Sequence, residues 1–191
     1  VNTTADNNTG IGYFALGANT SGFANTAIGS QAGDALTTGN NNIAVGVNAL
    51  GADTLGDRSV AVGNETLSSQ NFTSSTDVYN VAVGYQAGFA ITTGSQNTLI
   101  GGTAGDALTD ADFNVAVGYN ALGGDTLGNR SVAIGYETLK AQNFTSATSS
   151  NNTAVGFHAG NDVTTGTNNT LIGANAADKT TTGINNVAVG S

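Results

Sequence analysis

The chain has 191 residues and a net charge of −9, and it contains 28 Gly, 28 Thr and 25 Asn, a composition that indicates a repeat protein. Only four residues are basic and 13 are acidic. Because phosphate binding needs clustered cations, we expect no nucleic-acid partner. The absence of Cys and the presence of one histidine, His158, exclude disulfides, thiolate metal sites and paired-imidazole chemistry. No apolar run is long enough to insert into a membrane.

A five-residue pattern recurs along the whole chain: Asn or Ser, then Thr, Val or Ile, then Ala or Leu, then Val or Ile, then Gly. The glycines that close it are Gly12, Gly29, Gly46, Gly63, Gly84, Gly101, Gly118, Gly135, Gly156, Gly173 and Gly190. The interval from each glycine to the next is 17, except for two intervals of 21, so that three short units and one long unit form a superperiod of 72. We therefore expect residues 1–191 to form a single repeat domain.

The predicted elements are short strands that end at each of these glycines, from the one before Gly12 to the one before Gly190. Gly, Thr, Asn and β-branched residues disfavour helix and favour strands and turns. We predict an all-β fold, a parallel β-solenoid or β-roll of ten to eleven coils, with one coil for each interval of 17 or 21. With coils stacked about 4.8 Å apart, the rod is about 50 Å long. Asn side chains are expected to bond between adjacent coils.

The strand before each glycine has apolar residues at three consecutive positions, which predicts a strand that is dry on both faces. We expect an outward stripe of small alanines over which rods pack laterally as a closed homo-oligomer. The candidate interface residues are Ala27, Ala44, Ala61, Ala82, Ala116, Ala133, Ala154 and Ala188. The alternative is a monomeric two-layer solenoid on which the alanine stripe is plain surface.

These residues resemble a known repeat. The sequence Asn-Thr-Ala-Val-Gly at 152–156, followed by Thr-Thr-Gly at 164–166, is similar to the head repeat of YadA-like trimeric autotransporter adhesins. It resembles still more closely the repeat shafts of phage and phage-like tail-fibre proteins. The resemblance covers nearly the whole chain and implies a parallel β-roll assembled as a side-by-side homotrimer. The units here are longer than the commonest adhesin head repeat, and we expect the parent fibre to continue in both directions.

The sequence predicts no enzyme activity, cofactor or metal. Asp106, Asp110 and Asp112 form the densest acidic group, which could bind calcium, but an Asp-rich turn on a soluble rod explains it as well. His158 occupies a position where other units have Gln or Asn, which indicates a polar turn residue rather than a ligand.

Two features are candidates for receptor contact. Tyr85, Tyr119 and Tyr136 directly follow repeat glycines, where they could contact sugar rings or, alternatively, shield a corner between coils or plug the oligomer seam. Phe72 and Phe144 lie in the insertions of the two long units, where a loop could bind a partner or Phe could anchor the loop.

Three functions follow from these observations. The first is a structural and adhesive segment of an extracellular trimeric fibre, a phage or phage-like tail fibre whose receptor is a cell-surface glycan or protein. The second is the head domain of a bacterial trimeric autotransporter adhesin. The third is a monomeric ice-binding solenoid, although its threonine row is interrupted at Leu55, Asp110 and Leu127.

Overall fold

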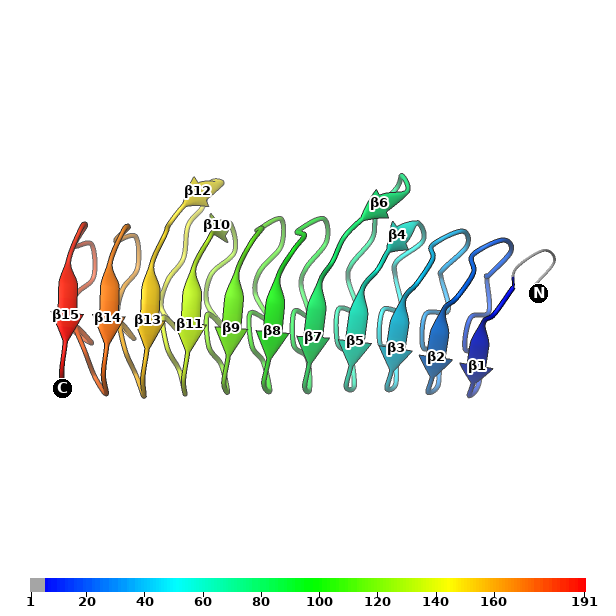
Figure 1. Cartoon of the computed structure of the whole chain (residues 1–191), viewed down its shortest axis with the longest axis horizontal. Coiled ribbons are helices and arrows are strands. Elements are labelled where there is room, and N and C mark those ends of the chain that lie inside the picture. The colour runs from blue at the N-terminus through cyan, green and yellow to red at the C-terminus, as the bar shows by residue number, and fades with distance from the viewer. Residues whose placement is uncertain (1–5) are drawn as a thin grey trace.

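The computed structural model describes residues 6–191 and shows an all-β rod of stacked coils (Figure 1). Residues 1–5 of the predicted repeat domain lie outside the described residues. One parallel sheet of eleven strands runs along the rod, and each of its strands is the triplet that precedes a repeat glycine. These strands are β1 (Thr9–Ile11), β2 (Thr26–Ile28), β3 (Ile43–Val45), β5 (Val60–Val62), β7 (Val81–Val83), β8 (Thr98–Ile100), β9 (Val115–Val117), β11 (Val132–Ile134), β13 (Thr153–Val155), β14 (Thr170–Ile172) and β15 (Val187–Val189). The prediction of a parallel β-solenoid of about eleven turns is confirmed.

Two further pairs of short strands join each long unit to the short unit before it. β4 (Gly56–Asp57) pairs with β6 (Thr76–Asp77), and β10 (Gly128–Asn129) pairs with β12 (Thr148–Ser149). β6 and β12 project from the same edge of the rod, each beside its partner in the preceding coil (Figure 1). The two projections are one superperiod apart, which is four coils or about 20 Å along the rod.

Main-chain hydrogen bonds join each coil to the next on more than one side of the rod. In the strands the residues pair at equivalent positions, so that Ala27 lies opposite Ala44. In the turns the same translation holds: the Gly33 amide donates to the Ala49 carbonyl at 2.9 Å. Equivalent residues of successive coils therefore stack directly over one another.

The repeat glycines are required by this stacking. Gly46 has φ +136°, and a Cβ on it would lie 2.2 Å from the carbonyl oxygen of Gly63 in the next coil. Neither the backbone conformation nor the space admits a side chain. The closing position of the repeat is therefore Gly in every coil.

A ladder of buried Asn side chains ties the start of most strands to a turn of the following coil, with Ser59 and Ser131 in place of Asn before β5 and β11. Asn25 Nδ2 donates to the carbonyl of Gly39 at 2.7 Å, and Asn25 Oδ1 accepts the main-chain N–H of Asn42 at 2.9 Å. Asn42 repeats the pattern with Gly56 and Ser59. These contacts confirm the expected bonding of Asn between coils, and they satisfy amides that would be costly to bury unpaired.

The alanine stripe points into the rod, so the predicted interface of alanines is wrong. Ala27, Ala44, Ala61, Ala82, Ala116, Ala133 and Ala154 are at most 1% exposed within a single chain, and Ala188 is half-buried in the last coil. The middle residue of a three-residue strand faces opposite to its two neighbours. Here the middle residue faces the narrow interior, and the flanking Val and Ile face outward.

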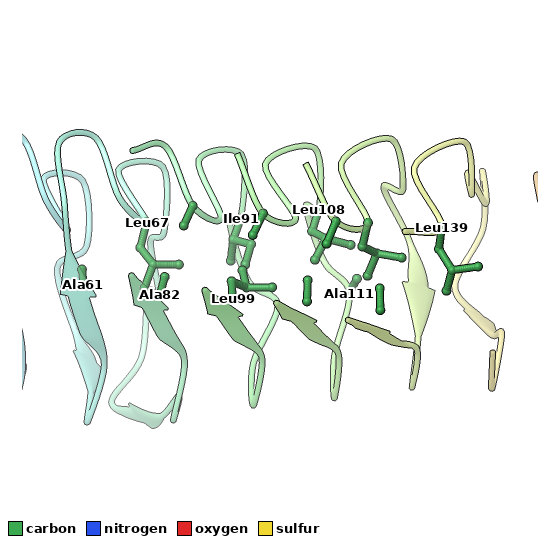
Figure 2. Packing of buried hydrophobic residues seen from close by; sticks show 14 of the residues in the cluster. Ala61, Leu67, Ala82, Ile91, Leu99, Leu108, Ala111 and Leu139 are labelled. Carbon is green, nitrogen blue, oxygen red and sulfur yellow. The ribbon is translucent and has the colours of Figure 1, made fainter. Parts of the chain in front are cut away.

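The interior is filled by pairing large residues with small ones (Figure 2). Where the strand has Leu99 instead of Ala, the neighbouring corners have Gly88 and Gly105, and a Cβ on either would lie 2.8 or 2.9 Å from a methyl carbon of Leu99. Where the strand has Ala, as in β5 and β7, a corner Leu such as Leu67 fills the space. Leu99 thus occupies space that the corner glycines leave free, and where the strand has Ala a corner Leu can occupy the interior instead.

Ala116→Glu should disrupt the fold, because it places a charge in this interior, where no partner can compensate its desolvation. We expect loss of the β-sheet circular dichroism signal, or a fall of several kcal/mol in the unfolding free energy. Circular dichroism and urea unfolding of the purified variant check this. A folded variant with normal stability would contradict the inward direction of the alanine stripe.

Candidate functional site

The outer face of the large sheet is an apolar strip. We call the first and third residues of its eleven strands the outer strip. They are mainly Val, Ile and Thr, and side chains such as Ile43, Ile100 and Ile134 are 40%, 40% and 37% exposed. No residue of these strands is charged. A contiguous exposed apolar surface of this kind marks an interaction site.

The outer strip follows directly from the local sequence. β-branched residues fit a pleated surface, and the parallel pairing places each of them over its equivalent in the next coil, for example Val60 beside Val81. The result is two straight rows with a spacing of about 4.8 Å, one of Val and Ile at the third position and one of Val, Ile and Thr at the first position. The sequence prediction that this strand is apolar on both faces is correct, but the residues were assigned to the wrong faces.

An aromatic row lies directly after the strands, at the corner of the rod. The Tyr119 and Tyr136 rings stack with centroids 5.5 Å apart, and the Tyr136 and Phe157 rings stack with centroids 5.4 Å apart. Both faces of Tyr136 are therefore covered by other rings. The row has the geometry of a ladder that shields the corner, and it offers a ligand mainly ring edges and hydroxyl groups.

The three candidate tyrosines are all exposed: Tyr85 by 54%, Tyr119 by 52% and Tyr136 by 44%. Tyr85 differs from the other two because no aromatic ring among residues 6–191 stacks on it. Receptor contact by these side chains stays a prediction. If a sugar ring stacks on a tyrosine face, Tyr85 is the one with its faces free of other rings.

Charged groups flank the aromatic row. Lys140 Nζ lies 2.9 Å from Glu137 Oε1, and His158 Nε2 lies 3.2 Å from Glu137 Oε2 without hydrogen-bond alignment. The hydrogen bond from Lys140 lowers the pKa of Glu137, and the same bond raises the pKa of Lys140. The His158 ring packs on Phe157 with centroids 4.0 Å apart. His158 is thus part of the corner packing, as expected for a polar turn residue.

Phe72 and Phe144 are anchors of the two insertions and not receptor contacts. Their exposed fractions are only 8% and 6%. Their main-chain amides each donate to a buried carboxylate, Asp53 Oδ1 and Asp125 Oδ1, at 3.1 Å. A bulky apolar side chain at the base of a polar loop is more stable when buried than when exposed, which explains why the alternative of a local anchor is the correct one.

A buried polar network supports each insertion, and sequence reasoning missed it. Gln70 Nε2 donates to Asp53 Oδ2 at 2.6 Å and to Ser59 Oγ at 3.0 Å, while Gln70 Oε1 accepts from Asn80 Nδ2 at 2.9 Å. Burial raises the pKa of Asp53. Asp125, Gln142, Ser131 and Asn152 repeat the arrangement in the second long unit. The sequence signal that could have indicated this network is the recurrence of Asp and Gln after one superperiod, Asp53 with Asp125 and Gln70 with Gln142.

The acidic residues Asp106, Asp110 and Asp112 do not converge. Asp110 accepts from Thr93, Asp112 accepts from Ser95, and Asp106 is partly buried, which raises its pKa. Within residues 6–191 no three acidic or histidine side chains are arranged as a metal site.

Comparison of the chain with models of protein families, with curated proteins and with solved structures finds no match. The part of the chain that the structure describes has no helix capable of crossing a membrane. The outer strip, the aromatic row and the two projecting loops are the surface features of the rod that repeat or stack along its length.

Phe144→Ala should loosen the second insertion and leave the first intact. Removing a buried Phe costs about 3–5 kcal/mol of local packing. We expect faster cleavage by a nonspecific protease within residues 143–151, mapped by mass spectrometry, while residues 71–79 keep their wild-type cleavage rate. Phe157→Ala, at an exposed ring, is the control. Equal cleavage of the Phe144→Ala variant and the wild-type chain would contradict the anchoring role.

Proposed function

We propose that this chain is a rod-shaped structural and adhesive segment of an extracellular homotrimeric fibre, of the phage or phage-like tail-fibre type, that contacts a bacterial surface. The observation that carries the proposal is the outer strip, an uncharged aliphatic face along the whole described rod. The resemblance of the repeat to tail-fibre shafts and adhesin heads supports the same assignment.

The occupant of the outer strip is best explained as further copies of this chain. A second copy presents the same rows with the same spacing over the same length, so the side chains of two copies can interdigitate in every coil. The chain has a net charge of −9, and an interface between copies must avoid its carboxylates. The strands that form the outer strip contain no charged residue.

The size of the face is sufficient for a stable contact. On a rod about 50 Å long, a contact about 16 Å wide buries the roughly 800 Å² per partner that is typical of specific interfaces. A closed ring of copies covers the strip of every member, whereas an open arrangement leaves strips free to form fibres or aggregates, which favours a closed ring. The resemblance to trimeric adhesin heads supports three members in that ring.

The adhesive role is assigned to the surface that remains outside the trimer. The projecting loops around β6 and β12 lie on a buried aromatic anchor and have mainly small polar side chains, Thr-Ser-Ser-Thr-Asp at 73–77 and Thr-Ser-Ala-Thr-Ser at 145–149. Loops held on a rigid scaffold are common binding sites. In this arrangement the coils set the spacing of the loops along the fibre, and no chemical reaction is involved.

The double variant Ile100→Glu/Ile134→Glu should dissociate the oligomer without unfolding the rod. Both side chains lie on the outer strip, where a carboxylate is solvated in the monomer and repelled by its equivalents in a trimer. Light scattering should give three times the 18.8 kDa chain mass for the wild type and a smaller mass for the variant. Thr73→Glu/Thr145→Glu, on the projecting loops, should keep the trimer mass. A monomeric wild-type chain at all concentrations would contradict the proposal.

Adhesion is tested with a fluorescently labelled chain and intact cells. The tail-fibre assignment predicts saturable binding to some bacterial strains in a panel, and loss of binding after periodate oxidation of the surface glycans. Binding to animal cells or extracellular matrix, without binding to bacteria, would instead support the head of a bacterial adhesin.

A further inference from the structure

The only arginines of the chain, Arg58 and Arg130, lie at equivalent positions of the superperiod, each in the short unit that directly precedes a long unit. Each follows the first strand of a small projecting sheet, β4 or β10, and each is exposed. The two sites therefore have the same scaffold, and any difference between them comes from the side chains around the guanidinium.

In the first copy the arginine is neutralised within the chain. Arg58 forms an ion pair with Asp77, and its guanidinium carbon lies 5.8 Å from the centroid of the Tyr79 ring. In the second copy the residue equivalent to Asp77 is Ser149. Arg130 Nη1 donates to Ser149 Oγ at 2.7 Å, and the guanidinium carbon lies 5.6 Å from the centroid of the Phe113 ring.

Arg130 differs from every other Lys and Arg in having no carboxylate partner among residues 6–191. Arg58 pairs with Asp77, Lys140 with Glu137, and Lys179 with Asp162. The nearby carboxylates are engaged elsewhere: Asp112 accepts from Ser95, and Asp125 accepts from the buried amides of the insertion. The guanidinium of Arg130 is thus a positioned cation without a counter-charge.

We propose that Arg130, Ser149 and Phe113 form a binding site for an anionic group of a surface glycan, a carboxylate or a phosphate, and that Asp77 closes the equivalent site in the first copy. This inference rests on the proposed adhesive function. A guanidinium that is held against an aromatic ring keeps its planar fork oriented, and the fork matches the two oxygens of such an anion. The Ser149 hydroxyl oxygen accepts a hydrogen bond from Nη1 and so holds the guanidinium in place. The hydroxyl proton of Ser149 can be donated to the ligand.

The net charge of the rod does not prevent this. At physiological ionic strength charges are screened beyond about 8 Å, so a bound anion responds chiefly to its immediate neighbours. The groups that contact the guanidinium itself are the Ser149 hydroxyl and the Phe113 ring, and no carboxylate forms an ion pair with it among residues 6–191. The long-range repulsion acts mainly on the rate of encounter.

The test uses the whole chain and two defined probes, an oligogalacturonate for the carboxylate and a glycerol-phosphate oligomer for the phosphate, with a neutral oligosaccharide of similar size as control. Binding is followed by calorimetry or by chemical-shift changes. We expect one site per chain for at least one anionic probe and none for the neutral one. Whichever probe binds more tightly identifies the source of the anion.

Three variants exploit the internal pair. Arg130→Gln removes the charge, and Ser149→Asp copies the closed site, so each should weaken binding about tenfold or more. Asp77→Ser should open the first copy and raise the stoichiometry to two sites per chain. All three positions are exposed, and thermal unfolding should confirm that the variants fold as the wild type.

Binding that is unchanged in Arg130→Gln and Ser149→Asp, or no binding of either probe, would overturn the inference. Asp77→Ser with a single site would show that Asp77 is not the closing group. The failure of this inference is distinguishable from failure of the proposed function. If the wild-type chain is a trimer that attaches to cells and Arg130→Gln attaches equally well, the adhesive function stands and this site is contradicted. If the chain is a monomer that binds the anionic probe but does not attach to cells, the site stands and the proposed function is contradicted.

Discussion

The constraint on which this structure depends is the pairing of each coil with the next at one fixed translation. Main-chain hydrogen bonds such as Gly46 N–H to Ile28 O, at 2.8 Å, set that translation, and the closing glycines permit the backbones to approach. Every other feature inherits the translation. The Asn ladder, the aliphatic rows and the aromatic row are each a single local contact repeated along the rod, and a substitution that is tolerated in one coil must also be compatible with the coils on both sides.

This constraint explains what the sequence could predict and what it could not. The regular interval between closing glycines, the strand triplets and the parallel stacking are all readable, because equal spacing of Gly and β-branched residues has few structural explanations. The triplets alone do not show which of their side chains face the interior of the rod. Most triplets contain only Val, Ala and Ile, so alternation gives little contrast between the faces. The one polar signal is the Thr that opens five triplets, as at Thr98 and Thr153, and it lies on the outer face. The decisive information lies in pairs distant in the sequence: Leu99 occurs in the strand where the corners have Gly88 and Gly105, which shows that the middle residue faces the corners.

The insertions illustrate a second limit. Phe72 and Phe144 lie in polar loops. The neighbouring sequence is compatible both with an exposed Phe that contacts a receptor and with a buried Phe that anchors the loop. Burial is decided by Asp53, Gln70 and Asn80, which come from three different parts of the coils and meet beneath the loop. Such a network has no local sequence pattern. Only the exact recurrence of these residue types after 72 positions indicates that they act together.

The same internal recurrence separates packing from recognition. Between the two long units the buried residues are retained: Leu67 and Leu139, Gln70 and Gln142, Phe72 and Phe144, Asn80 and Asn152. The exposed residues around the arginines differ, with Asp77 and Tyr79 replaced by Ser149 and Asn151. Buried positions are restricted by the volume of a thin coil and by hydrogen bonds that must all be satisfied, whereas a side chain on a projecting loop is restricted only by what it meets outside. A solenoid of this type can therefore present unlike surfaces on like scaffolds at a fixed spacing, and the spacing is set by the coils between them and not by the loops themselves.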